Sequence, residues 1–271
     1  MGKPQILLTN DDGIKSPGLW AAAEALSDIG FVTVAAPRDQ SSGMGRSLPS
    51  TADERILTEV VHVCEKDWTV YAVGGSPAQA VLHGILEIMP QRPDLVVSGI
   101  NYGENVGTGV TISGTVGAAL EAASNGIPAL AMSLETDRQH HQSYSTEIDF
   151  STAAYFAAKF ARQLLEKRFP YDIDVLKVDV PSDANRATPW EVTRVAHQRY
   201  YLPIPPKRKS WDEPGAVDYE EAAVLDGERE DSDVYVLRVK RHISVTPLSL
   251  DLTSRVDPGE LNRLLRDGVD R

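Results

Sequence analysis

Two adjacent carboxylates, Asp11 and Asp12, stand in the segment Asn10-Asp11-Asp12-Gly13, directly after a short apolar run. Neighbouring carboxylates repel each other unless a cation or a shared proton compensates their charge. A hard divalent ion such as Mg²⁺ or Mn²⁺ is the simplest compensation, because these ions prefer oxygen ligands. The alternative is an Asx turn with helix-capping acids, since Asp-Gly is a common turn pair. The segment alone leaves both interpretations open.

Two further loops carry polar side chains in equivalent places, each after an apolar run. Residues 37–45 read PRDQSSGMG, and residues 98–105 read SGINYGEN. If the loops converge on Asp11 and Asp12, every candidate ligand is an oxygen: two carboxylates, a serine hydroxyl and an asparagine carbonyl. The sequence has no competing cluster of histidines and cysteines, which argues against zinc and favours Mg²⁺ or Mn²⁺. Either loop taken singly would be an ordinary turn.

A third segment could hold an anion. Ser113-Gly114-Thr115 precedes a helical pattern, so free backbone N–H groups and two hydroxyls would stand together at a helix start. Such a start attracts phosphate, although an isolated Ser-Gly-Thr is more often a plain N-cap. The sequence contains no GxxxxGKS or GxxxxGKT loop, no GxGxxG after a strand and no GxSxG elbow. Nucleoside triphosphate, dinucleotide and serine-hydrolase interpretations therefore lack direct support.

Strands and helices that alternate along the first half of the chain would position these segments. Five apolar runs predict strands, at residues 5–9, 31–36, 69–73, 94–98 and 128–133. Amphipathic patterns predict helices that begin near residues 17, 77 and 113. This alternation favours an α/β fold with a mostly parallel sheet and helices on both faces. Ligands bind at the carboxyl ends of the strands in such sheets, which is where the polar loops fall.

The second half of the chain has a different pattern. A long amphipathic helix is expected at residues 151–167, and a strand at residues 173–180. Residues 190–245 are rich in prolines and charges. Short alternating runs within them, such as 191–196 and 234–239, predict hairpins that project from the core.

We therefore divide the chain into two regions. Residues 1–185 form the α/β core with the active site. Residues 186–271 comprise a hairpin arm, a returning strand and a short charged helix at residues 257–266. The arm could serve as a lid over the substrate or as a contact between subunits.

The composition is that of an ordinary folded protein. Of its 271 residues, 42% are hydrophobic and 24% are charged, as in typical globular domains. The formal net charge of −12 makes a nucleic-acid polymer an unexpected partner. The single cysteine, Cys64, excludes an intrachain disulfide, and no stretch approaches the roughly 20 apolar residues of a membrane span. We expect a cytoplasmic protein with no membrane partner.

Taken together, the motifs resemble the SurE family, the survival-protein-E 5′/3′-nucleotidases. The N-terminal part of the resemblance is ILLTNDDGI at residues 6–14, SPGL at 16–19, and Ala36-Pro37 with Ser42 and Gly43. Further along the chain it comprises GSPA at 75–78, VSGINYG at 97–103, SGTVGAALE at 113–121, VDVP at 178–181 and ISVTPL at 243–248. It therefore spans nearly the whole chain in order.

The resemblance implies a fold and an activity. The fold would be a Rossmann-like α/β core with a projecting C-terminal β-hairpin arm, assembled into homodimers or homotetramers that exchange C-terminal elements. The activity would be that of a divalent-metal-dependent phosphomonoesterase, a 5′-nucleotidase that hydrolyses nucleoside 5′(3′)-monophosphates to nucleoside and phosphate. Short-chain polyphosphate would be a further substrate. The alternative is a protein that binds nucleotide or metal without turnover.

The resemblance also implies roles for individual residues. One Mg²⁺ or Mn²⁺ ion per subunit would be held by Asp11, Asp12, Ser42 and Asn101. The catalytic residues would be Asp11, Asp12 and Asn10. The phosphate would be bound by Gly43, Asn101, Asn105, Ser113, Gly114 and Thr115.

Overall fold

A central sheet organises the molecule. The computed structural model describes residues 2–63 and 66–266, so Cys64 lies outside the described residues. The strands of this sheet are β1 (Gln5–Thr9), β2 (Phe31–Pro37), β3 (Ile56–Val63), β4 (Lys66–Val73), β5 (Leu95–Tyr102), β6 (Ala129–Leu134), β7 (Val175–Val180), β8 (Trp190–Val192) and β11 (Ile243–Leu248). Their spatial order is β3-β4-β2-β1-β5-β6-β7-β11-β8.

The middle of the sheet is parallel, and its strand order reverses once. Each neighbouring pair from β4 to β7 is parallel, whereas β3 and β11 run antiparallel to β4 and β7. From β1 the chain builds outward through β2 to β4 on one side. It then crosses back to β5 and continues through β6 to β7 on the other. The carboxyl ends of β1 and β5 therefore flank a topological switch point, the usual ligand position in open α/β sheets.

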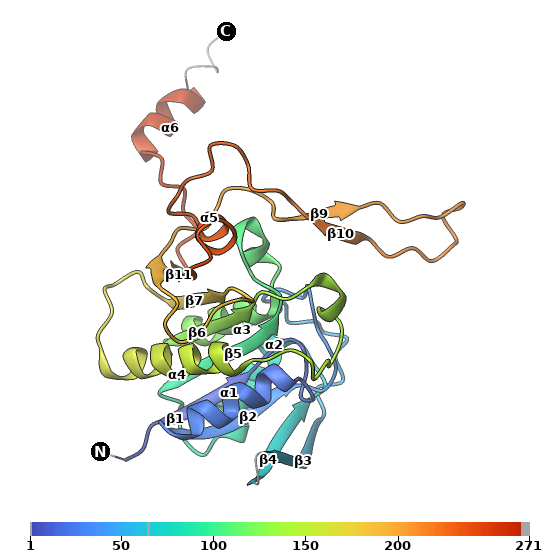
Figure 1. The fold of residues 1–271 in the computed structure, drawn as a ribbon, viewed down its shortest axis with the longest axis vertical. Helices are drawn as coiled ribbons and strands as arrows, with labels where there is room; N and C mark the ends of the chain where they lie inside the picture. Colours follow the sequence, from blue (N-terminus) through green and yellow to red (C-terminus); the bar gives the residue numbers. More distant parts are fainter. Residues whose placement is uncertain (1, 64–65, 267–271) are drawn as a thin grey trace.

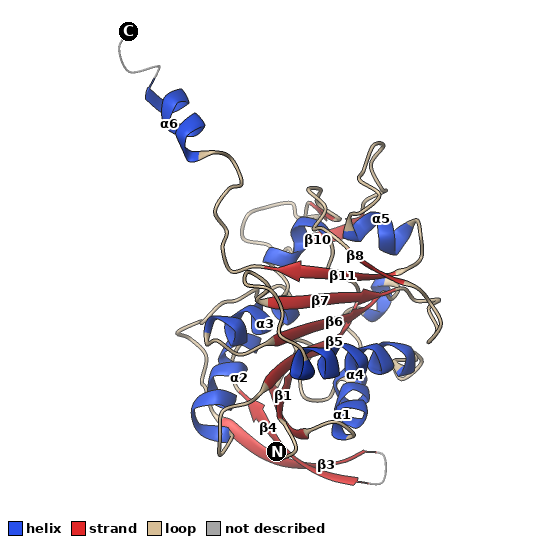
Figure 2. Cartoon of the chain, turned by 90° about the vertical axis from the view of Figure 1, so that its left-hand side faces the viewer, coloured by secondary structure: helices blue, strands red, loops and turns tan. Residues whose placement is uncertain are grey.

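Helices cover both faces of the sheet, as predicted (Figure 2). They are α1 (Pro17–Ser27) with α4 (Ser151–Glu166) on one face, and α2 (Pro77–His83) with α3 (Gly114–Ser124) on the other. Along β1, Ile6 and Leu8 pack beneath α1 and α4, while Leu7 packs beneath α2 and α3. The strand is apolar on both sides because neither side of a covered parallel sheet meets water. The predicted Rossmann-like α/β core is confirmed.

Three elements differ from the prediction. Residues 191–196, predicted as part of a projecting hairpin, instead overlap β8, which pairs parallel with β11 at the edge of the central sheet. The strand β3 was not predicted, because its residues alternate between exposed and partly buried positions at the sheet edge, which weakens the apolar signal. Residues 234–239, predicted as part of a hairpin, instead lie in the helix α5 (Asp233–Arg238). The Ser232 hydroxyl caps α5 by accepting a hydrogen bond from Tyr235 N at 3.1 Å. Val234 and Leu237, three positions apart, both face a small apolar cluster around Tyr200, so helical spacing takes precedence over the alternating pattern.

The C-terminal region extends away from this body (Figure 1). Strands β9 (Tyr201–Ile204) and β10 (Asp218–Glu221) pair antiparallel in the projecting arm, as predicted. The helix α6 (Pro258–Arg266) stands apart, and all of its residues are exposed. From the same region, β8 and β11 join the central sheet. Among the described residues, no helix has the length and apolar character needed to cross a membrane.

Candidate active site

The loop after β1 places two carboxylates at the switch point. Asn10 closes this loop: its Nδ2 donates to Gly13 O at 3.0 Å, and its Oδ1 accepts from Gly13 N at 3.1 Å. Gly13 has a φ of +94°, a conformation that side-chain-bearing residues rarely adopt. Asp11 and Asp12 are presented by this turn and are only 4% and 2% exposed. Asn10 thus shapes the loop with its side chain rather than pointing it at a ligand.

Asp11 faces the end of β5 and the start of α3. Its carboxylate accepts a hydrogen bond from the Thr115 hydroxyl, and the same hydroxyl oxygen lies 3.3 Å from Asn101 Oδ1. The Asn101 amide nitrogen donates to Tyr102 O at 3.2 Å and to Gly103 O at 2.6 Å. This orientation turns the Asn101 carbonyl oxygen towards Asp11, as a metal ligand at this position requires.

Asp12 is held by the loop after β2, by the end of β5 and by Tyr144, which lies outside the sequence motifs. Its Oδ2 accepts from Tyr102 N at 3.2 Å, and its Oδ1 lies 3.4 Å from Gln40 Nε2. The backbone carbonyl of Asp12 accepts from the Tyr144 hydroxyl at 3.0 Å. Gln40 Nε2 also donates to His141 O at 2.7 Å, so the loop that carries His141 and Tyr144 braces this carboxylate.

His141 makes contacts with the arm that its polar surroundings in the sequence do not indicate. Its Nδ1 lies 2.9 Å from the Tyr219 hydroxyl of β10, and its Nε2 lies 3.1 Å from Thr136 O. The imidazole also stacks on the Tyr219 ring at 6.1 Å between centroids. No local signal could have shown this, because the partner belongs to the arm, 78 residues further along the chain.

The two carboxylates are electrostatically uncompensated. Burial raises the pKa of Asp11 above its usual value. Burial together with the charge of Asp11 raises the pKa of Asp12 well above its usual value. Neither forms an ion pair within the described part of the chain. A divalent cation would relieve both effects, and the nearby donors are oxygens, which suits Mg²⁺ or Mn²⁺.

The described residues contain no group of three or more His, Cys, Asp and Glu side chains that could hold a metal ion. A site here would therefore depend on the two carboxylates with neutral oxygens from Asn101 and a serine. Ser42 and Gly43 are exposed in the loop after β2, and Ser42 forms no hydrogen bond in the described structure through its side chain. The neighbouring Ser41 is buried and donates its backbone N–H to Asp11 O at 2.7 Å. The loop thus lies against Asp11, with the Ser42 hydroxyl left available.

The start of α3 packs directly on Asp11. Ser113 caps the helix, as predicted, by accepting from Val116 N at 3.1 Å. The backbone N–H groups of Gly114 and Thr115 favour the charged form of the Asp11 carboxylate, although burial has the larger effect on its pKa. A Cβ on Gly114 would lie 2.7 Å from Asp11 Cβ, so only glycine allows this approach. The start of α3, which the sequence predicts to bind an anion, therefore lies directly beside Asp11 of the acidic pair.

Asn105 makes its hydrogen bonds with β6 and β7 rather than with Asp11 or Asp12. Its Nδ2 donates to Ser133 Oγ at 2.8 Å, and its backbone N donates to Asp179 Oδ1 at 2.7 Å. The structure thus brings together Asp11, Asp12, Asn101, Gly114 and Thr115, and it ties Asn105 to β6 and β7. Gln40 and Tyr144 complete the surroundings of Asp12 and were not predicted.

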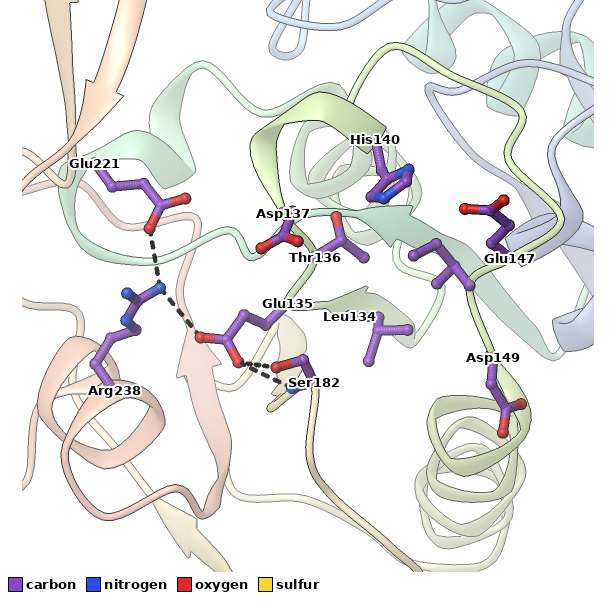
Figure 3. A pocket seen from close by; sticks show the side chains of 11 residues that line it. Leu134, Glu135, Thr136, Asp137, His140, Glu147, Asp149, Ser182, Glu221 and Arg238 are labelled. Carbon is purple, nitrogen blue, oxygen red and sulfur yellow. Dashed lines mark hydrogen bonds and ion pairs between the residues drawn. The ribbon is translucent and has the colours of Figure 1, made fainter.

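A separate cavity of about 390 Å³ lies at the root of the arm. Figure 3 shows Arg238 between Glu221 and Glu135, with Nη1 donating to each at 3.1 Å. Glu135 in turn accepts from the Ser182 hydroxyl and backbone N–H at 2.9 Å. No predicted site residue is among the described residues that line this cavity. Its ion cluster links Glu221 of β10 through Arg238 of α5 to Glu135, which follows β6.

Glu104, beside this cluster, gives a pH-dependent prediction. It is 1% exposed, its Oε1 lies 3.6 Å from Arg238 Nη1, and neither of its carboxylate oxygens has a hydrogen-bond partner among the described residues. Burial outweighs the ion pair and raises the pKa of Glu104 from 4.5 to about 7. The folded state therefore binds more protons than the unfolded state between these two values, and stability falls as the pH rises through them. Glu104→Gln should raise the free energy of unfolding by about 2–3 kcal/mol at pH 8 and change it little at pH 5.

Urea denaturation of the wild-type protein and of Glu104→Gln, at pH 5 and at pH 8, measures the change in the free energy of unfolding. Glu230→Gln, at an exposed glutamate, is the control and should change stability little at either pH. An equal effect of Glu104→Gln at both pH values would contradict the prediction.

The strand order, the switch point and the oxygen-lined acidic site define a Rossmann-like α/β protein with a polar ligand site at the carboxyl ends of β1 and β5. A family model described as Survival protein SurE matches residues 6–202. The chain belongs to this SurE family, so the resemblance drawn from its motifs is confirmed.

Individual relatives agree over nearly the full length. A curated protein named 5′-nucleotidase SurE from Methanosarcina mazei is 40% identical, over 98% of this chain and 100% of the relative. One of the same name from Thermococcus gammatolerans is 41% identical, over 96% of each chain. The crystal structure of the SurE protein from Aquifex aeolicus has a TM-score of 0.74 and 32% identity, covering 97% of this chain and all of that one.

Proposed function

We propose that this protein is a 5′-nucleotidase that hydrolyses nucleoside 5′-monophosphates to nucleoside and phosphate, with one Mg²⁺ or Mn²⁺ ion per subunit. The observation that carries the proposal is the buried, uncompensated pair Asp11 and Asp12 at the switch point. The names of the curated relatives support the substrate class. Nucleoside 3′-monophosphates and short-chain polyphosphate are proposed as further substrates.

The ion would be held by Asp11, Asp12, Asn101 and Ser42. When bound, a divalent ion offsets the negative charge that phosphoryl transfer spreads over the phosphate oxygens. Thr115 orients Asp11 through its hydroxyl. The backbone N–H of Tyr102 and the side-chain amide of Gln40 orient Asp12. These contacts place the carboxylates before substrate arrives.

The remaining phosphate oxygens would meet backbone and side-chain donors. We assign them to the start of α3, with Ser113, Gly114 and Thr115, and to Gly43 and Asn105 in the adjoining loops. A water would attack in line with the P–O bond to the leaving oxygen, and one carboxylate of the pair would accept its proton. As the P–O bond breaks, this proton would pass to the nucleoside oxygen, which leaves as a hydroxyl. Asn10 contributes by holding the loop through Gly13.

Removal and restoration of metal tests the proposal. Purified protein should release phosphate from nucleoside 5′-monophosphates, EDTA should abolish the release, and Mg²⁺ or Mn²⁺ should restore it. Parallel reactions with 3′-monophosphates and short-chain polyphosphate rank the substrates. Release that is unaffected by EDTA would contradict the metal role. Binding of metal or nucleotide by calorimetry, without any release, would favour the binding-protein alternative.

We further propose a cytoplasmic homodimer or homotetramer. Leu261, Leu264 and Leu265 on the isolated helix α6 are exposed in the single chain, which supports burial of this helix against a second copy. Light scattering of the full chain should give the mass of two or four subunits, and a chain that ends before α6 should give a smaller mass.

A further inference from the structure

A buried ion cluster joins β7 to α5. Lys177 and Asp179, two positions apart on β7, point to the same side of the sheet, and both are fully buried with Asp233 of α5. Lys177 Nζ forms an ion pair with Asp179 and lies 3.2 Å from Asp233 Oδ2. One ammonium thus bridges two carboxylates that would otherwise repel each other inside the protein.

Each carboxylate also accepts a hydrogen bond from the loop that leaves β5. Asp179 Oδ1 accepts from Asn105 N at 2.7 Å. The two oxygens of Asp233 accept from Gly107 N at 3.3 and 3.2 Å. Between these two anchored amides, the Val106 side chain is fully buried in the apolar cluster at the arm root. The backbone of residues 105–107 is therefore held from two elements that follow it in the sequence.

The register of the sheet adds a third contact. Asn101, Ser133 and Asp179 are successive cross-strand neighbours on β5, β6 and β7. Asn105 donates its side-chain amide to Ser133 and its backbone amide to Asp179. The candidate metal ligand Asn101 is thus the first member of a cross-strand row, and the other two members of that row hold the candidate phosphate ligand Asn105.

The cluster also reaches the arm. Asp233 Oδ1 accepts from Ala196 N at 2.8 Å, and residue 196 lies on the segment that leads into β9. From Gly107 the chain continues through a 3₁₀ turn, η2 (Gly107–Thr111), into the start of α3. Asp233 therefore contacts both the segment that leads into the arm, at Ala196, and the start of the turn that leads to α3, at Gly107.

We propose that Asp179 and Asp233, bridged by Lys177, are positioning residues that fix the loop of residues 103–107 and thereby set Asn105 for phosphate binding. The role of Asn105 rests on the function proposed above. Asp179 has two roles that can be separated: its acceptor oxygen holds the loop, and its negative charge balances Lys177. Asp179→Asn retains an acceptor oxygen, whereas Asp179→Ala removes it and leaves a buried N–H without a partner.

The test compares these two variants in the full chain, with inorganic phosphate as the probe. Asp179→Ala should raise the inhibition constant of phosphate and the KM of a nucleoside 5′-monophosphate on the order of tenfold, with a smaller change in kcat. Hydrogen exchange at the backbone amide of Asn105 should become faster in the same variant. Asp179→Asn should keep the inhibition constant of phosphate and the exchange rate at Asn105 close to those of the wild-type protein.

Phe160→Leu is the matched structural control, because Phe160 belongs to α4 and packs against the opposite face of the sheet. It should lower the thermal stability without changing the inhibition constant of phosphate. Where Asp179→Ala does not fold, Ser133→Ala removes the other partner of Asn105 and should also raise that constant.

Unchanged exchange at Asn105, an unchanged inhibition constant, or an Asp179→Asn variant as impaired as Asp179→Ala would each overturn the positioning role. Failure of the proposed function has a different signature, since the wild-type protein would then release no phosphate. Hydrogen exchange and direct calorimetric binding of phosphate would still test the loop in that case.

Discussion

Replacing Asp11 by Asn should abolish metal-dependent phosphate release while leaving the fold intact. The substitution keeps the size of the side chain but halves the negative charge of the buried pair. Because Asp11 has no cationic partner in the described structure, removing its charge also removes a burial cost. We expect kcat to fall by on the order of a thousandfold, which corresponds to several kcal/mol of lost charge stabilisation.

Three measurements on Asp11→Asn separate function from folding: the rate of phosphate release, calorimetric affinity for Mn²⁺, and thermal unfolding followed by circular dichroism. Asp39→Asn is a suitable control, because the Asp39 side chain is 85% exposed in a neighbouring loop. It should behave like the wild-type protein in all three. An Asp11→Asn protein that retains most of its activity would refute the metal assignment.

Gly114→Ala, which adds a single methyl group, should cause the second-largest loss of metal affinity and kcat. Alanine is a better helix former than glycine by about 1 kcal/mol, so α3 should form at least as readily. The new Cβ, however, would lie 2.7 Å from Asp11 Cβ and 2.8 Å from Asp11 Oδ2. Asp11 must shift to make room, and we expect metal affinity and kcat to fall by on the order of a hundredfold.

Gly109→Ala provides the comparison for this variant. Gly109 precedes α3 by only a few residues, and a Cβ there would have open space within 4 Å. This variant should keep both metal affinity and rate. If Gly114→Ala bound Mn²⁺ as tightly as Gly109→Ala, the contact between the helix start and Asp11 would not control the site.

The core and the convergence of the site could be predicted from the sequence for physical reasons. A parallel strand covered on both faces is apolar on both sides, as Ile6, Leu7 and Leu8 show, so its signal is strong and local. Once the strands are known, the loops at their carboxyl ends must meet at one edge. This explains why Asp11 and Asn101, 90 positions apart, could be grouped before the structure was known.

The contacts that refine the site could not be predicted in this way. Gln40, His141 and Tyr144 act through hydrogen bonds to segments far away in the sequence, and nothing in their neighbouring residues indicates the partner. The resemblance to the SurE family implied a catalytic role for Asn10. Its side chain turns back to Gly13, a choice of hydrogen-bond partner that the sequence leaves open.

The same reasoning applies to the C-terminal region. The residues of α5 alternate like a strand, and only burial of Val234 and Leu237 against Tyr200 makes the helix the better arrangement. The buried Lys177 likewise looks like a surface residue until Asp233 is placed beside it. Tertiary contacts, rather than local preference, decide these elements.

The dependence of the loop of residues 103–107 on Asp179 and Asp233 has a consequence for how the protein is made. Gly107 and its partner Asp233 are 126 positions apart. A nascent chain on the ribosome that has exposed the first five strands of the sheet can pack much of its core, yet its loop still lacks both anchors. Translation must deliver α5 before the loop settles, so catalytic competence should arise late, close to release of the chain. A chain stopped before residue 233 would lack both Asp233 and β11, and therefore one anchor of the loop and one strand of the central sheet.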